Sequence, residues 1–115
     1  MHELSIALSI LDIAAEEAGR QGCGSVRAIH LRLGPLSGVV PAALRSAYEL
    51  ARESSAAPNA ELVIEEIPLI AYCSKCSAER APPSAFELLC PECGTPMPEI
   101  IRGREMEVVA LELES

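Results

Sequence analysis

Two Cys-x-x-Cys pairs constrain the fold of this chain more than any other feature. Cys73 and Cys76 form the first pair, Cys90 and Cys93 form the second, and thirteen residues separate the pairs. Each pair can fold into a tight turn that presents two thiolates to one ion, and four thiolates in a tetrahedron suit Zn²⁺. No histidine lies near either pair in the sequence. The spacing therefore predicts an all-cysteine structural zinc site.

The residues around the second pair fit such a turn. Pro91 stiffens the backbone between the two cysteines, and Gly94 follows the pair at a position where positive φ is tolerated. Cys23 stands apart, after an expected helix end, and is interpreted as a packed or idle thiol.

Two other uses of the four cysteines stay open. They would form two disulfides in an oxidising compartment, although the chain shows neither a secretory signal nor further cysteine-rich sequence. One pair would serve as a redox dithiol if it lay beside a βαβ pattern, but the second pair then has no role. Spacing and context favour zinc over both.

The charge and the aromatic content argue against nucleic acid as a partner. The chain has 17 acidic and 9 basic residues, a formal net charge of −8, and its aromatic residues are Tyr48, Tyr72 and Phe86. A zinc ion with four thiolates adds two more negative charges. Such a surface repels phosphate and lacks stacking aromatics, so we expect no nucleic-acid binding and a core built from aliphatic side chains. Long-range attraction would favour cations or basic surfaces.

We expect no membrane segment and a cytoplasmic location. The apolar run from Leu4 to Ala15 follows an acidic residue, lacks a basic leader and is interrupted by Asp12. These properties suit neither a membrane-spanning helix nor a signal peptide.

The first part of the chain predicts a helix and then a strand. Residues 3–20 have apolar positions at helical spacing, and glycines end the pattern. The expected apolar stripe is Leu4, Leu8, Leu11, Ala15 and Ala18, widened by Ile6, Ile10 and Ile13. Residues 28–33 alternate as a half-buried strand does, with Ile29, Leu31 and Leu33 on one face and Ala28, His30 and Arg32 on the other.

A second helix and two more strands complete the expected fold. The helix begins near Pro41 and has a stripe of Leu44, Ala47, Tyr48 and Ala51. Strands are expected over residues 61–67 and 105–113, on either side of the cysteine region, and the glutamates of the last strand are interpreted as a solvated face. The strands joined through the second helix would be parallel if adjacent.

The predicted fold class is α+β, with a small three-stranded mixed sheet, two helices packed on one face and an inserted zinc-ribbon module. The expected division is an α+β domain over residues 1–68 and 105–115, and a zinc-ribbon domain over residues 69–104. No nucleophile–base pair that would argue for an enzyme is found in the sequence.

The first three residues, Met1, His2 and Glu3, form a second candidate metal site. A histidine at position two can chelate a metal through its imidazole, its own amide nitrogen and the terminal amine of Met1. This nitrogen-rich set suits Ni(II) or Cu(II), and the carboxylate of Glu3 can add an oxygen. By itself, a histidine at position two is most often chance.

Taken together, the sequence resembles the HypA/HybF family of hydrogenase-maturation nickel chaperones. The resemblance covers nearly the whole chain and rests on MHELSIALSILDIA, HLRLGPLSGVVPAALRSAYELA, ELVIEEIP, the two cysteine pairs and EMEVVALELE. It implies nickel at Met1, His2 and Glu3, structural zinc at the four cysteines, and delivery of nickel to the large subunit of [NiFe] hydrogenase. It also implies a GTPase maturation factor of the HypB type as partner and, because some relatives supply urease, urease accessory proteins.

One departure from the family pattern concerns the start of the second helix. Family members often carry an acidic residue there that supports the nickel site, whereas this sequence has Val39-Val40-Pro41.

The alternative to a nickel chaperone is a zinc-ribbon interaction module without a transported metal, in which His2 is incidental. Nickel binding by intact protein separates the two.

Overall fold

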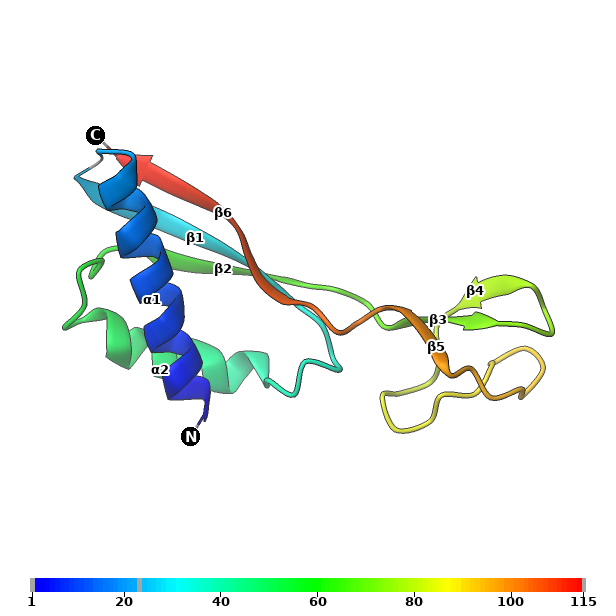
Figure 1. Cartoon of the computed structure of the whole chain (residues 1–115). Coiled ribbons are helices and arrows are strands. Elements are labelled where there is room, and N and C mark those ends of the chain that lie inside the picture. Colours follow the sequence, from blue (N-terminus) through cyan, green and yellow to red (C-terminus); the bar gives the residue numbers. More distant parts are fainter. Residues whose placement is uncertain (1, 23, 115) are drawn as a thin grey trace. The chain divides into compact units, whose positions relative to one another are not determined.

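The fold is taken from a computed structural model that describes residues 2–22 and 24–114, and Figure 1 traces its elements. Along the chain these elements are α1 (His2–Arg20), β1 (Ser25–Leu33), α2 (Pro41–Arg52), β2 (Glu61–Glu66), β3 (Ile70–Cys73), β4 (Ala78–Arg80), β5 (Glu99–Arg102) and β6 (Met106–Glu114).

These elements belong to two compact units. The first contains residues 1–32, 39–65 and 107–115, and the second contains residues 33–38 and 66–106. The division differs from the expected one mainly at residues 33–38, which the sequence analysis placed in the first domain. Backbone hydrogen bonds explain the difference, because Gly34 N–H donates to Glu105 O at 2.8 Å and Leu36 N–H donates to Gly103 O at 2.7 Å.

A three-stranded sheet with the order β2-β1-β6 is central to the first unit. The arrows in Figure 1 show β1 and β2 running the same way and β6 running the opposite way, so the sheet is mixed. Both helices lie on one face of the sheet and pack against each other. The predicted α+β fold class, with two helices on one sheet face, is confirmed.

The buried face of α1 differs from the expected stripe. Its buried residues are Ala7, Ile10, Leu11, Ala14 and Ala18. By contrast, Leu4, Leu8 and Ile13 are 38%, 47% and 49% exposed. Small alanines allow close approach of α1 to its neighbours, and the larger aliphatic side chains lie at the margins of the contact. The expected apolar face was therefore right at Ile10, Leu11 and Ala18 and wrong at Leu4, Leu8 and Ile13. The helix itself was predicted correctly.

Of the predicted stripe of α2, Leu44, Tyr48 and Ala51 are buried, and Ala47 is half-buried. Pro41 occupies the first turn, where its missing N–H removes no helical hydrogen bond. The Tyr48 hydroxyl donates to Ala60 O at 2.7 Å, and Arg52 Nη1 donates to the same oxygen at 2.9 Å. These bonds attach α2 to the segment that leads into β2.

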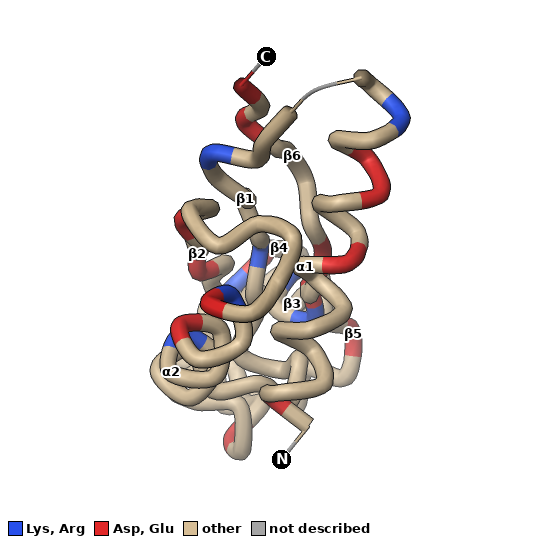
Figure 2. The backbone as a smooth tube through the Cα atoms, turned by 90° about the vertical axis from the view of Figure 1, so that its left-hand side faces the viewer, with Lys and Arg blue, Asp and Glu red and all other residues tan. Residues whose placement is uncertain are grey.

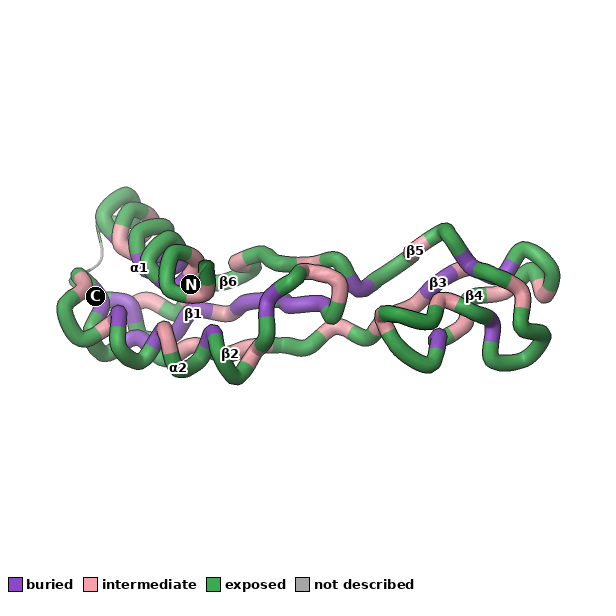
Figure 3. The backbone as a smooth tube through the Cα atoms, turned by 90° about the horizontal axis from the view of Figure 1, so that it is seen from below, coloured by how far each residue is buried: buried purple, intermediate pink, exposed green. Residues whose placement is uncertain are grey.

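The central strand β1 provides much of the core of the first unit. In Figure 3, several of its residues have the colour of buried residues. Ile29, Leu31 and Leu33 are buried as expected. Ala28 was expected on the polar face but is only 6% exposed. Its side chain is short, and β1 lies between two neighbouring strands whose longer side chains can cover it.

Ion pairs connect β1 to both of its neighbours on this polar face. His30 Nε2 lies 2.7 Å from Glu112 Oε2 of β6, and Arg32 Nε lies 3.2 Å from Glu65 Oε1 of β2. In the second unit, Glu105 Oε1 accepts a hydrogen bond from Gly103 N–H at 2.8 Å. The glutamates near β6 are therefore more than the solvated face that the sequence suggested, because Glu105 and Glu112 have specific partners.

The second unit contains the sheet β4-β3-β5, in which β3 pairs antiparallel with both neighbours. Its buried cluster consists of Ala71, Cys73, Cys90 and Met97, with Cys76 and Ile100 packed against it. So small a cluster buries little apolar area, and half of its members are cysteines. The unit is therefore expected to depend on its sulfur ligands for stability.

Candidate metal sites

The two Cys-x-x-Cys pairs converge on one point in the second unit. Cys73 Sγ lies 3.6 Å from Cys93 Sγ, and Cys76 Sγ lies 3.9 Å from Cys90 Sγ and 3.7 Å from Cys93 Sγ. All four ligand atoms lie within 4.8 Å of one another. A tetrahedron of sulfurs about 2.3 Å from a central zinc has edges of about 3.8 Å. The spacing fits one four-coordinate ion and is far longer than a disulfide bond of about 2.05 Å.

Local backbone geometry explains how each pair presents two sulfurs. Cys76 N–H donates to Cys73 Sγ at 3.3 Å, and Gly94 N–H donates to Cys90 O at 2.8 Å. The residue after each pair has positive φ, which is 53° at Ser77 and 75° at Gly94. Gly94 thus occupies the conformation that the sequence predicted, whereas Ser77 adopts it with a side chain.

The four sulfurs differ in exposure. Cys73 and Cys90 are buried, Cys76 is intermediate and Cys93 is exposed. Cys93 Sγ also shares a hydrogen bond of 3.1 Å with the Thr95 hydroxyl. The site therefore has a buried side and one exposed corner, through which an ion can enter.

Without a metal ion, Cys76, Cys90 and Cys93 differ in acidity. Hydrogen bonds from the Thr95 hydroxyl and backbone lower the pKa of Cys93 to about 6. Hydrogen bonding with Cys93 and then with Cys73 raises the pKa of Cys76 to about 12. Burial raises the pKa of Cys90, but backbone hydrogen bonds from Cys93 and Glu92 outweigh it, so that the pKa is lowered. A binding metal would displace the remaining protons.

Sequence reasoning missed two residues beside this site. Thr95 follows Cys93 by two positions, and its contact depends on the turn at Gly94. Arg80 lies on β4 opposite Ala71, on the face of the sheet that carries Cys73. Neither residue has a sequence signal of its own. The only clue is that each lies a few residues from a cysteine of the site.

The second candidate site lies at the start of α1. His2 Nε2 lies 3.4 Å from Glu3 Oε2, and the His2 side chain is 66% exposed. A hydrogen bond with its own backbone holds the pKa of Glu3 below its ordinary value; burial opposes this, and the charge of His2 adds to it. Met1, the third predicted nickel ligand, lies outside the described residues, as does Cys23.

The first turn of α2 contains no acidic residue, in agreement with the departure seen in the sequence. Among the described residues, the four cysteines are the only group of three or more His, Cys, Asp or Glu side chains arranged to hold a metal. The predicted zinc ligands are thus brought together, and His2 and Glu3 lie in contact with each other.

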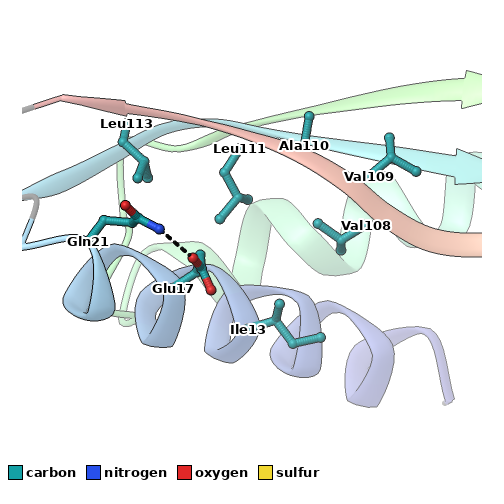
Figure 4. Close-up of a pocket in the computed structure, with 8 residues that line it drawn as sticks. All are labelled: Ile13, Glu17, Gln21, Val108, Val109, Ala110, Leu111 and Leu113. Atoms are coloured by element: carbon teal, nitrogen blue, oxygen red, sulfur yellow. Dashed lines mark hydrogen bonds between the residues drawn. The ribbon is translucent and has the colours of Figure 1, made fainter.

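A groove of about 410 Å³ between α1 and β6 is a different kind of site. Figure 4 shows Ile13 facing Val108 and Leu111 across it, and Gln21 Nε2 donates to Glu17 Oε2 at 2.9 Å. Its lining is largely aliphatic and contains a single carboxylate. This groove therefore lacks the ligands for a metal ion.

The charged residues suit a protein that attracts cations. Figure 2 shows acidic residues distributed over α1, β2 and β6. Their distribution agrees with the formal net charge of −8.

None of the described helices is both long and apolar enough to cross a membrane.

Comparisons with known proteins agree on one family. The family model described as hydrogenase/urease nickel incorporation, metallochaperone, HypA matches residues 1–113. A hydrogenase maturation factor HypA from Chloroflexus aggregans is 46% identical over 112 residues, covering 97% of this chain and 98% of the relative. The HypA of a Roseiflexus species is 45% identical, covering 99% of this chain and 93% of the relative.

Solved structures support the same fold. The solution structure of the Ni metallochaperone HypA from Helicobacter pylori has a TM-score of 0.66 and 24% identity, covering 98% of this chain and 97% of that one. Another solution structure of a HypA protein has a TM-score of 0.70 and 26% identity, covering 98% of this chain and 96% of that one. With the family match over nearly the whole sequence, these findings show that the chain belongs to the HypA family of nickel-incorporation metallochaperones for hydrogenase maturation, which are not enzymes.

Proposed function

We propose that this protein binds Ni(II) at its N-terminus and delivers it to the large subunit of [NiFe] hydrogenase, with a structural zinc ion held by Cys73, Cys76, Cys90 and Cys93. The nickel ligands are the terminal amine of Met1, the amide nitrogen and imidazole of His2, and the carboxylate of Glu3. The observation that carries the nickel site is the contact of 3.4 Å between His2 Nε2 and Glu3 Oε2 at the first turn of α1.

The contact with Glu3 suits a metal-binding imidazole. A carboxylate next to one ring nitrogen favours a proton there and raises the basicity of the other nitrogen. A proton on Nε2 leaves the lone pair on Nδ1, which closes a chelate ring with the amide nitrogen of His2; the Glu3 carboxylate leaves Nε2 when it adds its oxygen to the metal. Because α1 begins at His2, this amide has no acceptor four residues earlier, and nickel binding breaks no helical hydrogen bond.

The position of the site also suits release of the metal. The side chain of His2 is 66% exposed, so an acceptor protein can approach and exchange ligands one at a time. The positive end of the α1 dipole disfavours a bound cation modestly, and Glu3 in the first turn offsets part of that effect. Nickel can thus be bound and then passed on.

Zinc has a different role in this proposal. Four thiolates whose sulfurs all lie within 4.8 Å of one another suit a closed tetrahedral site with no open position for a substrate. Such a site stabilises the second unit and does not transfer its ion. The two metals therefore have separate functions in one chain.

The family assignment supports further parts of the proposal. The family is named for nickel incorporation into hydrogenase and urease. We therefore propose a GTPase maturation factor of the HypB type and urease accessory proteins as additional partners, no nucleic-acid partner, and a cytoplasmic location.

Nickel titration of untagged protein tests the proposal. Wild type, His2→Ala and His30→Ala are titrated side by side by calorimetry, with zinc content measured in each sample. His2→Ala should abolish the tight nickel site and keep one zinc per chain. His30→Ala is the matched control because it removes an imidazole that pairs with Glu112 and should leave nickel binding unchanged. Equal nickel binding in all three proteins would refute the N-terminal site.

A further inference from the structure

Strand register places Arg80 on the same side of the ribbon sheet as the metal ligands. β3 pairs with β4 so that Ala71 faces Arg80 and Cys73 faces Ala78. Residues directly opposite each other in an antiparallel pair project to the same face, as do residues two apart on one strand. Ala71 and Cys73 are both fully buried. The Arg80 side chain therefore starts from the face that carries the buried cysteines.

The guanidinium of Arg80 is incompletely satisfied by the described protein atoms. Its Nη1 donates to Glu79 O at 3.3 Å, and its Nε is buried and has no hydrogen-bond partner in the described structure. A buried donor of a charged group without an acceptor is strongly unfavourable, so such a donor is expected to have a function. On this face of the sheet, the sulfurs of the cysteine site are acceptors of suitable charge.

We propose that Arg80 is an outer-sphere partner of the four-thiolate site, where its guanidinium donates N–H···S hydrogen bonds to the thiolates and slows loss of the metal. This inference rests on the zinc site proposed above. Arginine suits the role because it presents several donors in a rigid fork and does not lose its charge.

Electrostatics gives the physical reason. Zinc with four thiolates carries two negative charges, and the chain around it is acidic, with a formal net charge of −8. A cation at the ligands offsets this charge and makes each thiolate a poorer proton acceptor.

Lys75 provides a matched control in the same chain. It lies between the two cysteines of the first pair and is exposed to solvent. Lys75→Gln and Arg80→Gln both remove one positive charge beside the site. They differ in that only Arg80 projects onto the buried cysteine face.

The test measures zinc release from the full-length protein to an excess of a chromophoric chelator at fixed pH. Wild type, Arg80→Gln, Arg80→Lys and Lys75→Gln are first shown to contain one zinc per chain. Arg80→Gln should release zinc at least about 10-fold faster, which is the lower end of the usual effect of losing an outer-shell partner. Arg80→Lys should be intermediate, because it keeps the charge and loses the fork. Lys75→Gln should release zinc at the wild-type rate.

A spectroscopic measurement separates direct hydrogen bonding from a loss of folding. In cobalt-substituted protein, removing N–H···S donors makes the thiolates stronger electron donors, so the sulfur-to-cobalt charge-transfer bands should move to lower energy in Arg80→Gln and stay unchanged in Lys75→Gln. Equal release rates and equal spectra in both variants would overturn the role of Arg80 while leaving the zinc site intact. Absence of zinc from wild-type protein would instead overturn the zinc site and, with it, this inference.

Discussion

Gly34 and Gly103 lie in direct backbone contact: a Cβ atom on Gly34 would lie 2.3 Å from both the carbonyl carbon and the carbonyl oxygen of Gly103. Two hydrogen bonds hold the segments at this distance, from Gly34 N–H to Glu105 O and from Leu36 N–H to Gly103 O. Because backbone atoms cannot move aside as a flexible side chain can, this contact requires glycine at position 34.

Gly34→Ala should therefore destabilise the second unit. The added methyl group forces the two segments apart, and overpacking of this kind costs about 1–3 kcal/mol. The measurement is the midpoint of denaturant unfolding, with hydrogen exchange at residues 103–105 as a local probe. Gly19→Ala is the control, since position 19 is helical and its Cβ would meet nothing within 4 Å. It should leave stability unchanged or raise it by up to about 1 kcal/mol. A Gly34→Ala protein as stable as wild type would show that the segments separate freely.

Tyr48→Phe should destabilise the first unit by about 0.5–1.5 kcal/mol, the usual value for one buried hydrogen bond. The lost bond is the one from the Tyr48 hydroxyl to Ala60 O at 2.7 Å. Arg52 also donates to this oxygen, which keeps the acceptor satisfied and limits the loss. Tyr72→Phe removes a hydroxyl from β3 and serves as the control in the same unfolding assay. A larger loss of unfolding free energy in Tyr72→Phe than in Tyr48→Phe would contradict a stabilising hydrogen bond from the Tyr48 hydroxyl.

The Tyr48 hydroxyl should lose its proton at a higher pH than an ordinary tyrosine does. Burial raises the pKa of Tyr48 from 10.0 to about 12. A raised folded-state pKa means that the neutral phenol stabilises the fold fully below pH 10, and that this contribution is lost as the pH rises through 12. Ultraviolet absorbance should show a tyrosinate step near pH 12 in wild type that is missing in Tyr48→Phe. A wild-type titration complete by pH 11 would disprove the buried environment.

Local sequence patterns predicted the metal ligands and the buried face of α2, but not the whole buried face of α1. The four cysteines were predictable because ligand spacing is a local property, and the stripe through Leu44 and Tyr48 was predictable because α2 has a clearly polar opposite face. The buried face of α1 was not, because this helix has apolar residues on most sides and several stripes fit the same period. Ala7 and Ala14 form its buried face through close approach to neighbours, which no single helix reveals.

Contacts between segments that are distant in the chain could not be predicted from the sequence either. Gly34 has an ordinary turn signal, and its need for glycine comes from Gly103, which lies far along the chain. Likewise, the position of Arg80 beside the cysteines depends on the register that pairs it with Ala71. The pairing of His30 with Glu112 depends on β6 lying next to β1. Such contacts can be predicted only when the strand order or the register of a sheet is known.

Cys90→Ala should unfold the second unit locally and leave the first unit folded. Cys90 belongs to the small buried cluster with Ala71, Cys73 and Met97, so its loss removes both a ligand and part of the core. Zinc content should fall well below one per chain, hydrogen exchange should become fast over residues 66–106, and nickel binding should persist. Ser74→Ala, at an exposed position between the first two cysteines, is the control. Tight retention of one zinc in an ordered Cys90→Ala protein would mean that another ligand set holds the metal.

The chain end provides the most direct test of the central claim. Adding two residues, Gly-Ser, before Met1 turns the terminal amine into a peptide nitrogen and moves the new terminus away from His2, while every native residue is kept. The α1 helix and the cysteine site do not depend on that amine, so zinc content and melting temperature should match wild type. We predict that calorimetric nickel titration of the extended protein will show a weakened site with an altered absorption spectrum, as in His2→Ala. Nickel affinity and spectrum identical to those of the unextended protein would contradict coordination by the terminal amine.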